Sequence, residues 1–116
     1  MACKQNIILT PVFYGDTWDG LSNCSFSSNG SAFGSNLTSI RMFFKDYDGV
    51  TGLELTTANS NITIDNATAW EFTVNPITNM PLSVGMWFWS IETTDAESVR
   101  KTRVFGTLEI LDHATR

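Results

Sequence analysis

The residues that could carry out acid–base or nucleophilic chemistry are few and scattered in this sequence. The single histidine, His113, lies in the polar C-terminal stretch DHATR, where we expect it to be solvated. This leaves no histidine to activate a serine or cysteine nucleophile on the ordered body of the protein. Neither Cys3 nor Cys24 belongs to a CxxC pair or has a histidine nearby in the sequence. We therefore predict no enzyme activity, no metal site and no cofactor.

Carboxylates are the next candidates for chemistry. Asp16 with Asp19, or Asp46 with Asp48, could form an acid–base pair of the kind that hydrolyses glycosides. Each pair adjoins a glycine, and turn geometry alone favours aspartate there. The stretch DYDG at 46–49 also resembles a fragment of a calcium-binding loop, but it lacks the later acidic ligand at the required spacing, for which Glu54 is a loose substitute. We interpret all four aspartates as turn residues.

The four tryptophans are the last candidates for a binding site. Exposed indoles bind sugars by stacking, so a carbohydrate-binding or adhesion module is an alternative function. Trp70, Trp87 and Trp89 lie in runs of alternating residues, where tryptophan usually packs in the core. Trp18 lies between two turn signals, Gly-Asp and Asp-Gly; we expect it to close one end of the core, although it is the most open of the four.

The elements that position these residues are predicted to be β-strands. Two runs rich in aromatic and β-branched residues, GMWFWSIETTD and TRVFGTLEIL, flank a polar turn at 95–98, which is the pattern of a β-hairpin. The first run has large side chains at successive positions, so we expect it to be central and covered on both faces. The other expected strands span residues 4–11, 21–28, 38–45, 53–55, 62–64 and 70–74, with a tight turn at Asn29-Gly30.

The spacing of strands and turns predicts the fold class. Apolar residues do not recur at helical spacing, and turn signals arrive about every eight to twelve residues. We predict an all-β protein with one antiparallel, Ig-like β-sandwich of about 7–8 strands over residues 1–116, and a flexible tail at about 112–116. The predicted core residues are Ile40, Met42, Phe44, Leu55, Ile64, Trp70, Phe72, Val74, Trp87, Trp89, Ile91, Leu108 and Ile110.

Composition excludes several classes of partner. Charged residues make up only 16% of the 116 residues and the formal net charge is −5, which argues against binding to nucleic acid or anionic lipid. No apolar window is long enough for a membrane span, and the N-terminal apolar run is too short for a signal peptide. We expect a cytoplasmic site of synthesis. A disulfide between Cys3 and Cys24 is possible, but we expect reduced thiols there.

The order of motifs resembles a known group of domains. A short opening strand leads into GDTWDGL, and LTSIRMFFK, ITIDN, FTVNP and the final hairpin GMWFWSIETTD…KTRVFGTLEI follow. This order is similar to small Ig-like β-sandwich domains of tailed-bacteriophage virion proteins, in particular the N-terminal domain of phage baseplate upper proteins. The resemblance implies a non-enzymatic structural subunit of the tail, neck or baseplate, or a capsid decoration protein. It implies a virion location after assembly in the host cytoplasm.

Such a subunit would bind copies of itself and other virion proteins through strand edges and exposed apolar side chains. We expect the first strand to supply an arm for such contacts, and outward-facing aromatic residues to add to it. The predicted assembly contacts are Ile7, Ile8, Leu9, Trp18, Phe43 and Phe88. A bound glycan remains possible under the alternative of an adhesion module.

Overall fold

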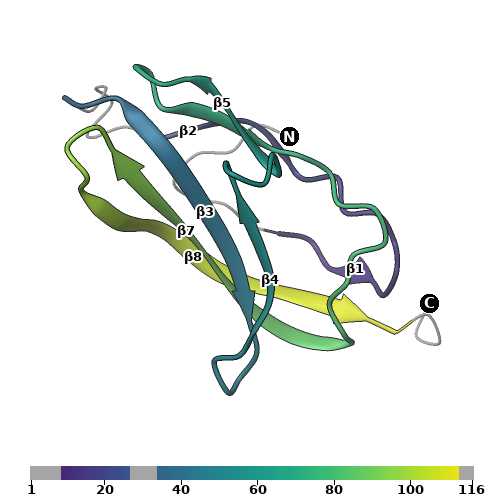
Figure 1. Ribbon diagram of the computed structural model, residues 1–116. Helices are drawn as coiled ribbons and strands as arrows, with labels where there is room; N and C mark the ends of the chain where they lie inside the picture. The colour runs from purple at the N-terminus through teal and green to yellow at the C-terminus, as the bar shows by residue number, and fades with distance from the viewer. Residues whose placement is uncertain (1–8, 27–33, 113–116) are drawn as a thin grey trace.

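Eight β-strands and no helix make up the part of the chain that the computed structural model describes, residues 9–26 and 34–112 (Figure 1). Alternating apolar residues give the strands one buried and one open side. The strands are β1 (Val12–Phe13), β2 (Leu21–Ser25), β3 (Leu37–Lys45), β4 (Thr51–Thr56), β5 (Ile62–Asn66), β6 (Glu71–Val74), β7 (Gly85–Asp95) and β8 (Arg100–Leu111).

The strands form two sheets around a common core, which confirms the predicted β-sandwich. The larger sheet has the order β1-β8-β7-β3-β4 and the smaller one has the order β2-β6-β5. Figure 1 shows β3, β7 and β8 running side by side as one long layer, with β2 and β5 in the other layer. All pairings are antiparallel except that of β1 with β8, which is parallel and sets Val12 beside Ile110. The purely antiparallel sheet that we predicted is therefore corrected at this edge.

The first predicted strand is displaced along the chain. Within the described residues the chain is not in a strand at 9–11, and β1 begins at Val12. Pro11 lacks a backbone N–H, so it cannot donate to a ladder at this point. Three predictions lie outside the described residues. They concern residues 4–8 of the predicted first strand, the turn at Asn29-Gly30 and most of the C-terminal tail.

β7 is the central strand of the larger sheet, as its composition predicted. It pairs with β3 on one side and with β8 on the other, so that Trp89 lies between Phe44 and Gly106. Twelve of the thirteen predicted core residues are buried, and the remaining one, Ile64, is partly buried against the core. The corner at the start of β7 is also fixed, because the indole Nε1 of Trp87 donates to the carbonyl oxygen of Ser83 at 2.9 Å.

One expectation about β7 is wrong, since only one of its faces is covered within the described residues. Trp87, Trp89 and Ile91 point into the sandwich, whereas Met86 and Phe88 on the other face are 36% and 38% exposed. The composition of a strand cannot reveal whether a second layer is supplied by the same chain.

Among the described residues there is no helix that could span a bilayer.

The state of the cysteines also differs from the prediction. Cys24 is fully buried on β2 and is disulfide-bonded, so the expectation of a reduced thiol is wrong there. The sequence has one other cysteine, Cys3, which lies outside the described residues. Cysteine spacing in the sequence does not indicate which segments are neighbours in the fold.

Candidate interaction surface

Among the aspartates that could have carried chemistry, Asp46 serves turn geometry through its side chain, and Asp16 makes a long-range contact through its backbone. Oδ1 of Asp46 accepts hydrogen bonds from the backbone N–H groups of Asp48 and Val50, both at 2.9 Å, and so closes the β3–β4 turn. The backbone carbonyl of Asp16 accepts from the N–H of Met80 at 2.9 Å, which ties the loop after β1 to the loop before β7. Within residues 9–26 and 34–112 there is no group of three or more histidine, cysteine or acidic residues that could hold a metal ion.

The tryptophans are interior residues. Trp70 and Trp89 are at most 2% exposed, and Trp18 and Trp87 are 6% and 8% exposed. The indole N–H groups of Trp70 and Trp89 donate to backbone carbonyls, of Ser35 at 2.7 Å and of Thr107 at 3.1 Å. The predicted core role is therefore confirmed, and none of the four indoles presents a face on which a sugar ring could stack.

The six predicted assembly contacts differ in where they lie: two are outside the described residues, two are buried and two are on the surface. Ile7 and Ile8 lie outside the described residues. Leu9 and Trp18 are buried, so they are corrected to core residues: Trp18 packs edge-on against Phe44 with ring centroids 6.0 Å apart. Phe43 and Phe88 do lie on the surface of the larger sheet that faces away from the core, with Phe43 half-buried and Phe88 38% exposed.

Phe43 and Phe88 belong to what we call the outer face, the side of β4, β3, β7 and β8 that is turned away from the smaller sheet. Strand register sets its residues in rows across the sheet. The outer face contains Arg41, Phe43, Lys45, Glu54, Met86, Phe88, Ser90, Glu92, Arg100, Phe105, Thr107 and Glu109. No described segment covers these residues.

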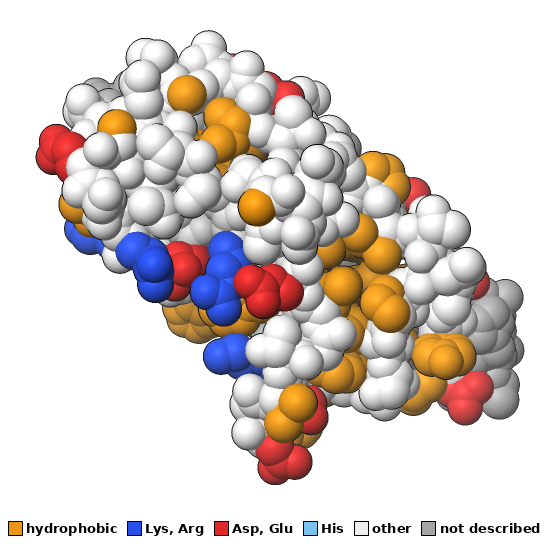
Figure 2. Space-filling model, viewed as in Figure 1, with side chains coloured by type: hydrophobic (Ala, Val, Ile, Leu, Met, Phe, Trp, Pro, Cys, Tyr) orange, Lys and Arg blue, Asp and Glu red, His pale blue; other side chains and the backbone are white. Residues whose placement is uncertain are grey.

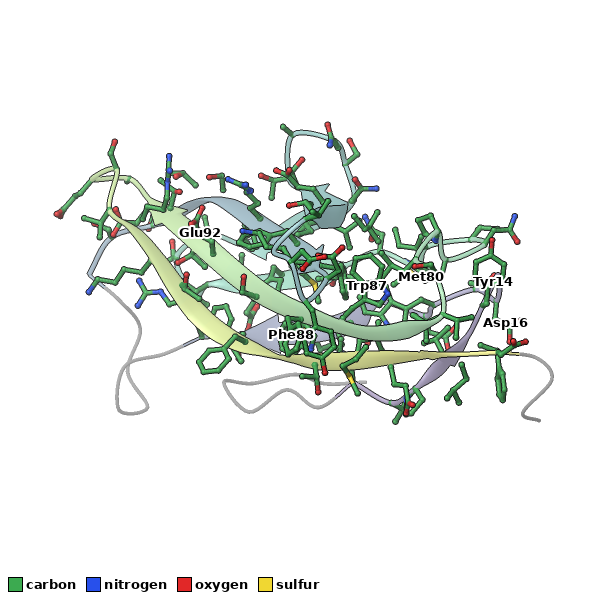
Figure 3. The ribbon with its side chains drawn as sticks, turned by 90° about the horizontal axis from the view of Figure 1, so that it is seen from below. Tyr14, Asp16, Met80, Trp87, Phe88 and Glu92 are labelled. Atoms are coloured by element: carbon green, nitrogen blue, oxygen red, sulfur yellow. The ribbon has the colours of Figure 1, made fainter. Side chains whose placement is uncertain are left out.

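Aromatic side chains occupy the middle of the outer face. Phe105 on β8 is 80% exposed, directly across Ser90 from Phe43. Tyr47, at the tip of the β3–β4 turn, is also 80% exposed and packs edge-on against Phe88 with ring centroids 5.1 Å apart. Figure 3 shows Phe88 where it projects from β7. Exposed aromatic rings grouped in this way make the outer face a candidate interaction surface.

Charged side chains surround these rings. The guanidinium of Arg41 and the ammonium of Lys45 each lie 4.9 Å from the ring centroid of Phe43, which is why this ring is only half exposed. Arg41 Nε also lies 2.8 Å from a carboxylate oxygen of Glu54 and Arg41 Nη1 lies 4.0 Å from one of Glu92. Figure 2 shows Lys and Arg side chains interleaved with Asp and Glu side chains along the edge of the molecule that β3 and β4 form. The outer face therefore has an aromatic centre within a border of mixed charge.

Sequence reasoning missed two of the most exposed aromatic residues, Phe105 and Tyr47. The signal for Phe105 was present, because the core positions predicted on the last strand, Val104 and Leu108, imply by alternation that residue 105 points outward. Tyr47 gave no such signal, because a turn residue has no strand periodicity. Its approach to Phe88 depends on how the β3–β4 turn bends over the sheet.

Beside the outer face, the β3–β4 turn and the segment before β7 enclose an open hollow of about 340 Å³. It is lined by residues 46–48 and 83–87, and its walls include the exposed side chains of Tyr47, Val84 and Met86. Asp48 adds a carboxylate to the lining. The hollow thus combines apolar walls with two acidic residues, Asp46 and Asp48, at the margin of the outer face.

Comparison with protein-family models and with curated proteins finds no match for this chain. Among solved structures, the chain is similar to the crystal structure of CopC from Methylosinus trichosporium OB3b, with a TM-score of 0.43 and 12% sequence identity over 71% of this chain and 72% of that one. A similarity at this level carries no argument about function.

Proposed function

We propose that this protein is a non-enzymatic structural subunit that assembles with other protein chains through its outer face. The observation that carries the proposal is the group of exposed aromatic rings there, above all Phe105, with Tyr47 and Phe88 beside it. Burying one such ring contributes roughly 1.5–3 kcal/mol to association. An aromatic centre with a polar border is the usual arrangement of a protein interface.

The shape of the outer face suits a protein partner better than a small molecule. It is the broad side of a β-sheet, and such sides pack against a second sheet about 10 Å away. β7 has the composition of a strand covered on both faces, yet the described residues cover only the side of Trp87 and Trp89. A partner chain on the side of Phe88 supplies the missing layer.

We further propose that the assembly is the virion of a tailed bacteriophage, in the tail, neck or baseplate, with a capsid decoration protein as the alternative. The support is the resemblance in strand and turn order from GDTWDGL to the final hairpin, together with a surface rich in hydroxyl and amide groups. The disulfide of Cys24 is compatible with this location, because disulfides persist on virion surfaces after release from a reducing cytoplasm.

The test of this function is incorporation into purified phage particles. Antibodies against the protein should label one fixed position on virions from cells that carry the gene. Phe105→Ser should reduce incorporation at least tenfold, since it removes the most exposed ring of the outer face. Val99→Ser is the matched control, because Val99 is an exposed apolar residue of the β7–β8 turn. Particles without the protein, or equal incorporation of both variants, would contradict the proposal.

A second candidate function is glycan binding at the hollow beside the outer face. The observation in its favour is Tyr47, whose ring is 80% exposed next to the carboxylate of Asp48, since sugars stack on such rings and donate hydroxyl hydrogens to acids. On a glycan array, Tyr47→Ala should abolish binding, whereas Tyr14→Ala should not. Tyr14 is the matched control because its ring is 52% exposed and does not line this hollow.

A further inference from the structure

We propose that the partner of the outer face is the outer face of a second copy of this chain, related by a two-fold axis that runs along the strands between β3 and β7. This inference rests on the proposed function and names the partner of the same surface. Such a contact uses one patch on both copies, so the patch must be complementary to itself. The register of β3 and β7 provides such complementarity along the axis.

The outward residues of β3 and β7 lie in register, and two of the three pairs, an ion pair and a cation beside a ring, are complementary. The pairs are Arg41 with Glu92, Phe43 with Ser90, and Lys45 with Phe88. A two-fold axis between the two strands sets β3 of one copy over β7 of the other. Arg41 then faces Glu92 of the second copy, and the Lys45 ammonium faces the ring of Phe88. Because the axis exchanges the copies, each of these contacts forms twice.

The contacts that Glu92 makes within one copy leave its carboxylate able to bind Arg41 of a second copy. Its carboxylate lies 4.0 Å from Nη1 of Arg41 and 3.8 Å from Nε of Arg100, which is longer than a charge-assisted hydrogen bond of about 2.7–2.9 Å. Glu92 is nevertheless held on the outer face between these two cations, and Figure 3 shows its place near one end of the sheet. A guanidinium from a second copy can approach the carboxylate within bonding distance.

The charge balance of the outer face also favours a second copy over a strongly charged partner. Its charged residues are the cations Arg41, Lys45 and Arg100 and the acids Glu54, Glu92 and Glu109. These sum to zero, whereas the whole chain has a formal net charge of −5. Two acidic chains repel each other least when they meet through a neutral face, and a neutral face gives no steering toward a basic or acidic partner.

The size of the outer face sets the expected strength of the contact. Four strands about 4.8 Å apart and about 20 Å of strand length give a projected footprint of roughly 400 Å² on each copy. That is below the roughly 600–1,000 Å² that each partner of a stable, specific interface buries, and it lies in the range of weak, transient contacts. Association should therefore depend on concentration in the micromolar to millimolar range, and repetition in an assembly would reinforce it.

Sedimentation of charge-reversed variants tests the proposal. Arg41→Glu and Glu92→Arg each place like charges opposite one another in both symmetric contacts, so each variant alone should dimerise at least tenfold more weakly than the wild type. In an equimolar mixture, one copy of each variant restores opposite charges at both contacts, and mixed dimers should form with near wild-type affinity. Lys101→Glu and Glu71→Arg are the matched controls, because they make the same charge changes away from the outer face.

Recovery of dimerisation on mixing supports a two-fold contact with a second copy. A different partner protein would bind each variant separately, so mixing the two variants would not restore its binding. A wild type that stays monomeric at millimolar concentration, or a mixture no stronger than its components, overturns the proposal. If in that case Phe105→Ser still blocks incorporation into particles, the proposed function stands and the partner is another virion protein. If purified phage particles do not contain the wild-type chain, the proposed virion function is itself contradicted.

A second measurement uses only the wild-type chain and so does not depend on the folding of any variant. On dilution, NMR amide shifts should change for outer-face residues of β3 and β7 and stay constant for β5 and β6 of the smaller sheet. Concentration-dependent shifts on β5 and β6, with none on β3 and β7, would overturn the proposal.

Discussion

Gly106 lies directly opposite Trp89 across the β7–β8 ladder, and the indole of Trp89 covers the place where a side chain at position 106 would begin. A Cβ atom added at Gly106 would lie 2.9 Å from Cζ2 and 3.0 Å from Cε2 of that indole. The ring cannot easily move, because it is 2% exposed and its Nε1 donates to the carbonyl oxygen of Thr107 at 3.1 Å. The glycine thus makes room for a core tryptophan.

We therefore expect Gly106→Ala to destabilise the protein by roughly 1–3 kcal/mol, the usual cost of overpacking a well-filled core. Urea unfolding followed by circular dichroism would measure the change as a lower midpoint at constant slope. Gly34→Ala is the control, because a Cβ at Gly34 would meet nothing within 4 Å, and it should change stability by no more than about 0.5 kcal/mol. Equal effects of the two substitutions would show that the indole does not confine position 106.

The turns of the two hairpins, DYDG at 46–49 and DAES at 95–98, share one hydrogen-bond pattern and have different residues at the fourth position, where φ is positive. In the β3–β4 turn, Gly49 has φ +80° and donates to the carbonyl of Asp46 at 3.0 Å. In the β7–β8 turn, Ser98 has φ +62° and donates to the carbonyl of Asp95 at 2.9 Å. Positive φ favours glycine and is unfavourable for serine.

From this comparison, Ser98→Gly should stabilise the protein by about 0.5–1 kcal/mol, after allowance for the greater freedom of glycine in the unfolded chain. The reciprocal change Gly49→Ser should destabilise it by a similar amount. Ala96→Gly, in the same turn as Ser98 but without positive φ, is the control and should not stabilise. Thermal unfolding measures all three, and the prediction fails if Ala96→Gly raises the midpoint as much as Ser98→Gly does.

The disulfide of Cys24 should contribute substantially to stability. Reduction should lower the free energy of unfolding by roughly 2–4 kcal/mol, because a disulfide at buried Cys24 restricts the unfolded chain. The measurement is urea unfolding with and without a strong reductant. A thiol titration of the denatured, unreduced protein should find no free thiol. Two titratable thiols under those conditions would show that the protein is isolated with its cysteines reduced.

The burial of all four tryptophans predicts their fluorescence. Trp18 and Trp87, the more exposed pair, are still under 10% exposed, so acrylamide should quench native emission weakly and unfolded emission strongly. Addition of sugars should leave the native emission unchanged. Strong quenching in the native state would indicate an indole in contact with water, and it would return tryptophan to the candidates for glycan binding.

Much of the fold followed from the sequence because alternation within a strand is a local property. The runs around Phe44, Phe72 and Trp89 alternate between apolar and polar or outward residues, and each became a strand with the expected face buried. Turn chemistry was equally local: Asp46 and Asp95 stand at the first position of their hairpin turns, where their carboxylates accept backbone N–H groups.

Only the tertiary structure decided which strand faces have a partner. It brought Val12 parallel to Ile110, bonded Cys24 and left the Phe88 side of β7 uncovered within the described residues. Each of these depends on contacts between segments far apart in the chain, which local periodicity does not encode. The outer face could be identified as a candidate site only from the structure. The alternation that orients Phe105 outward can be read from the sequence, whereas the exposure of this face within residues 9–26 and 34–112 depends on how the strands pack.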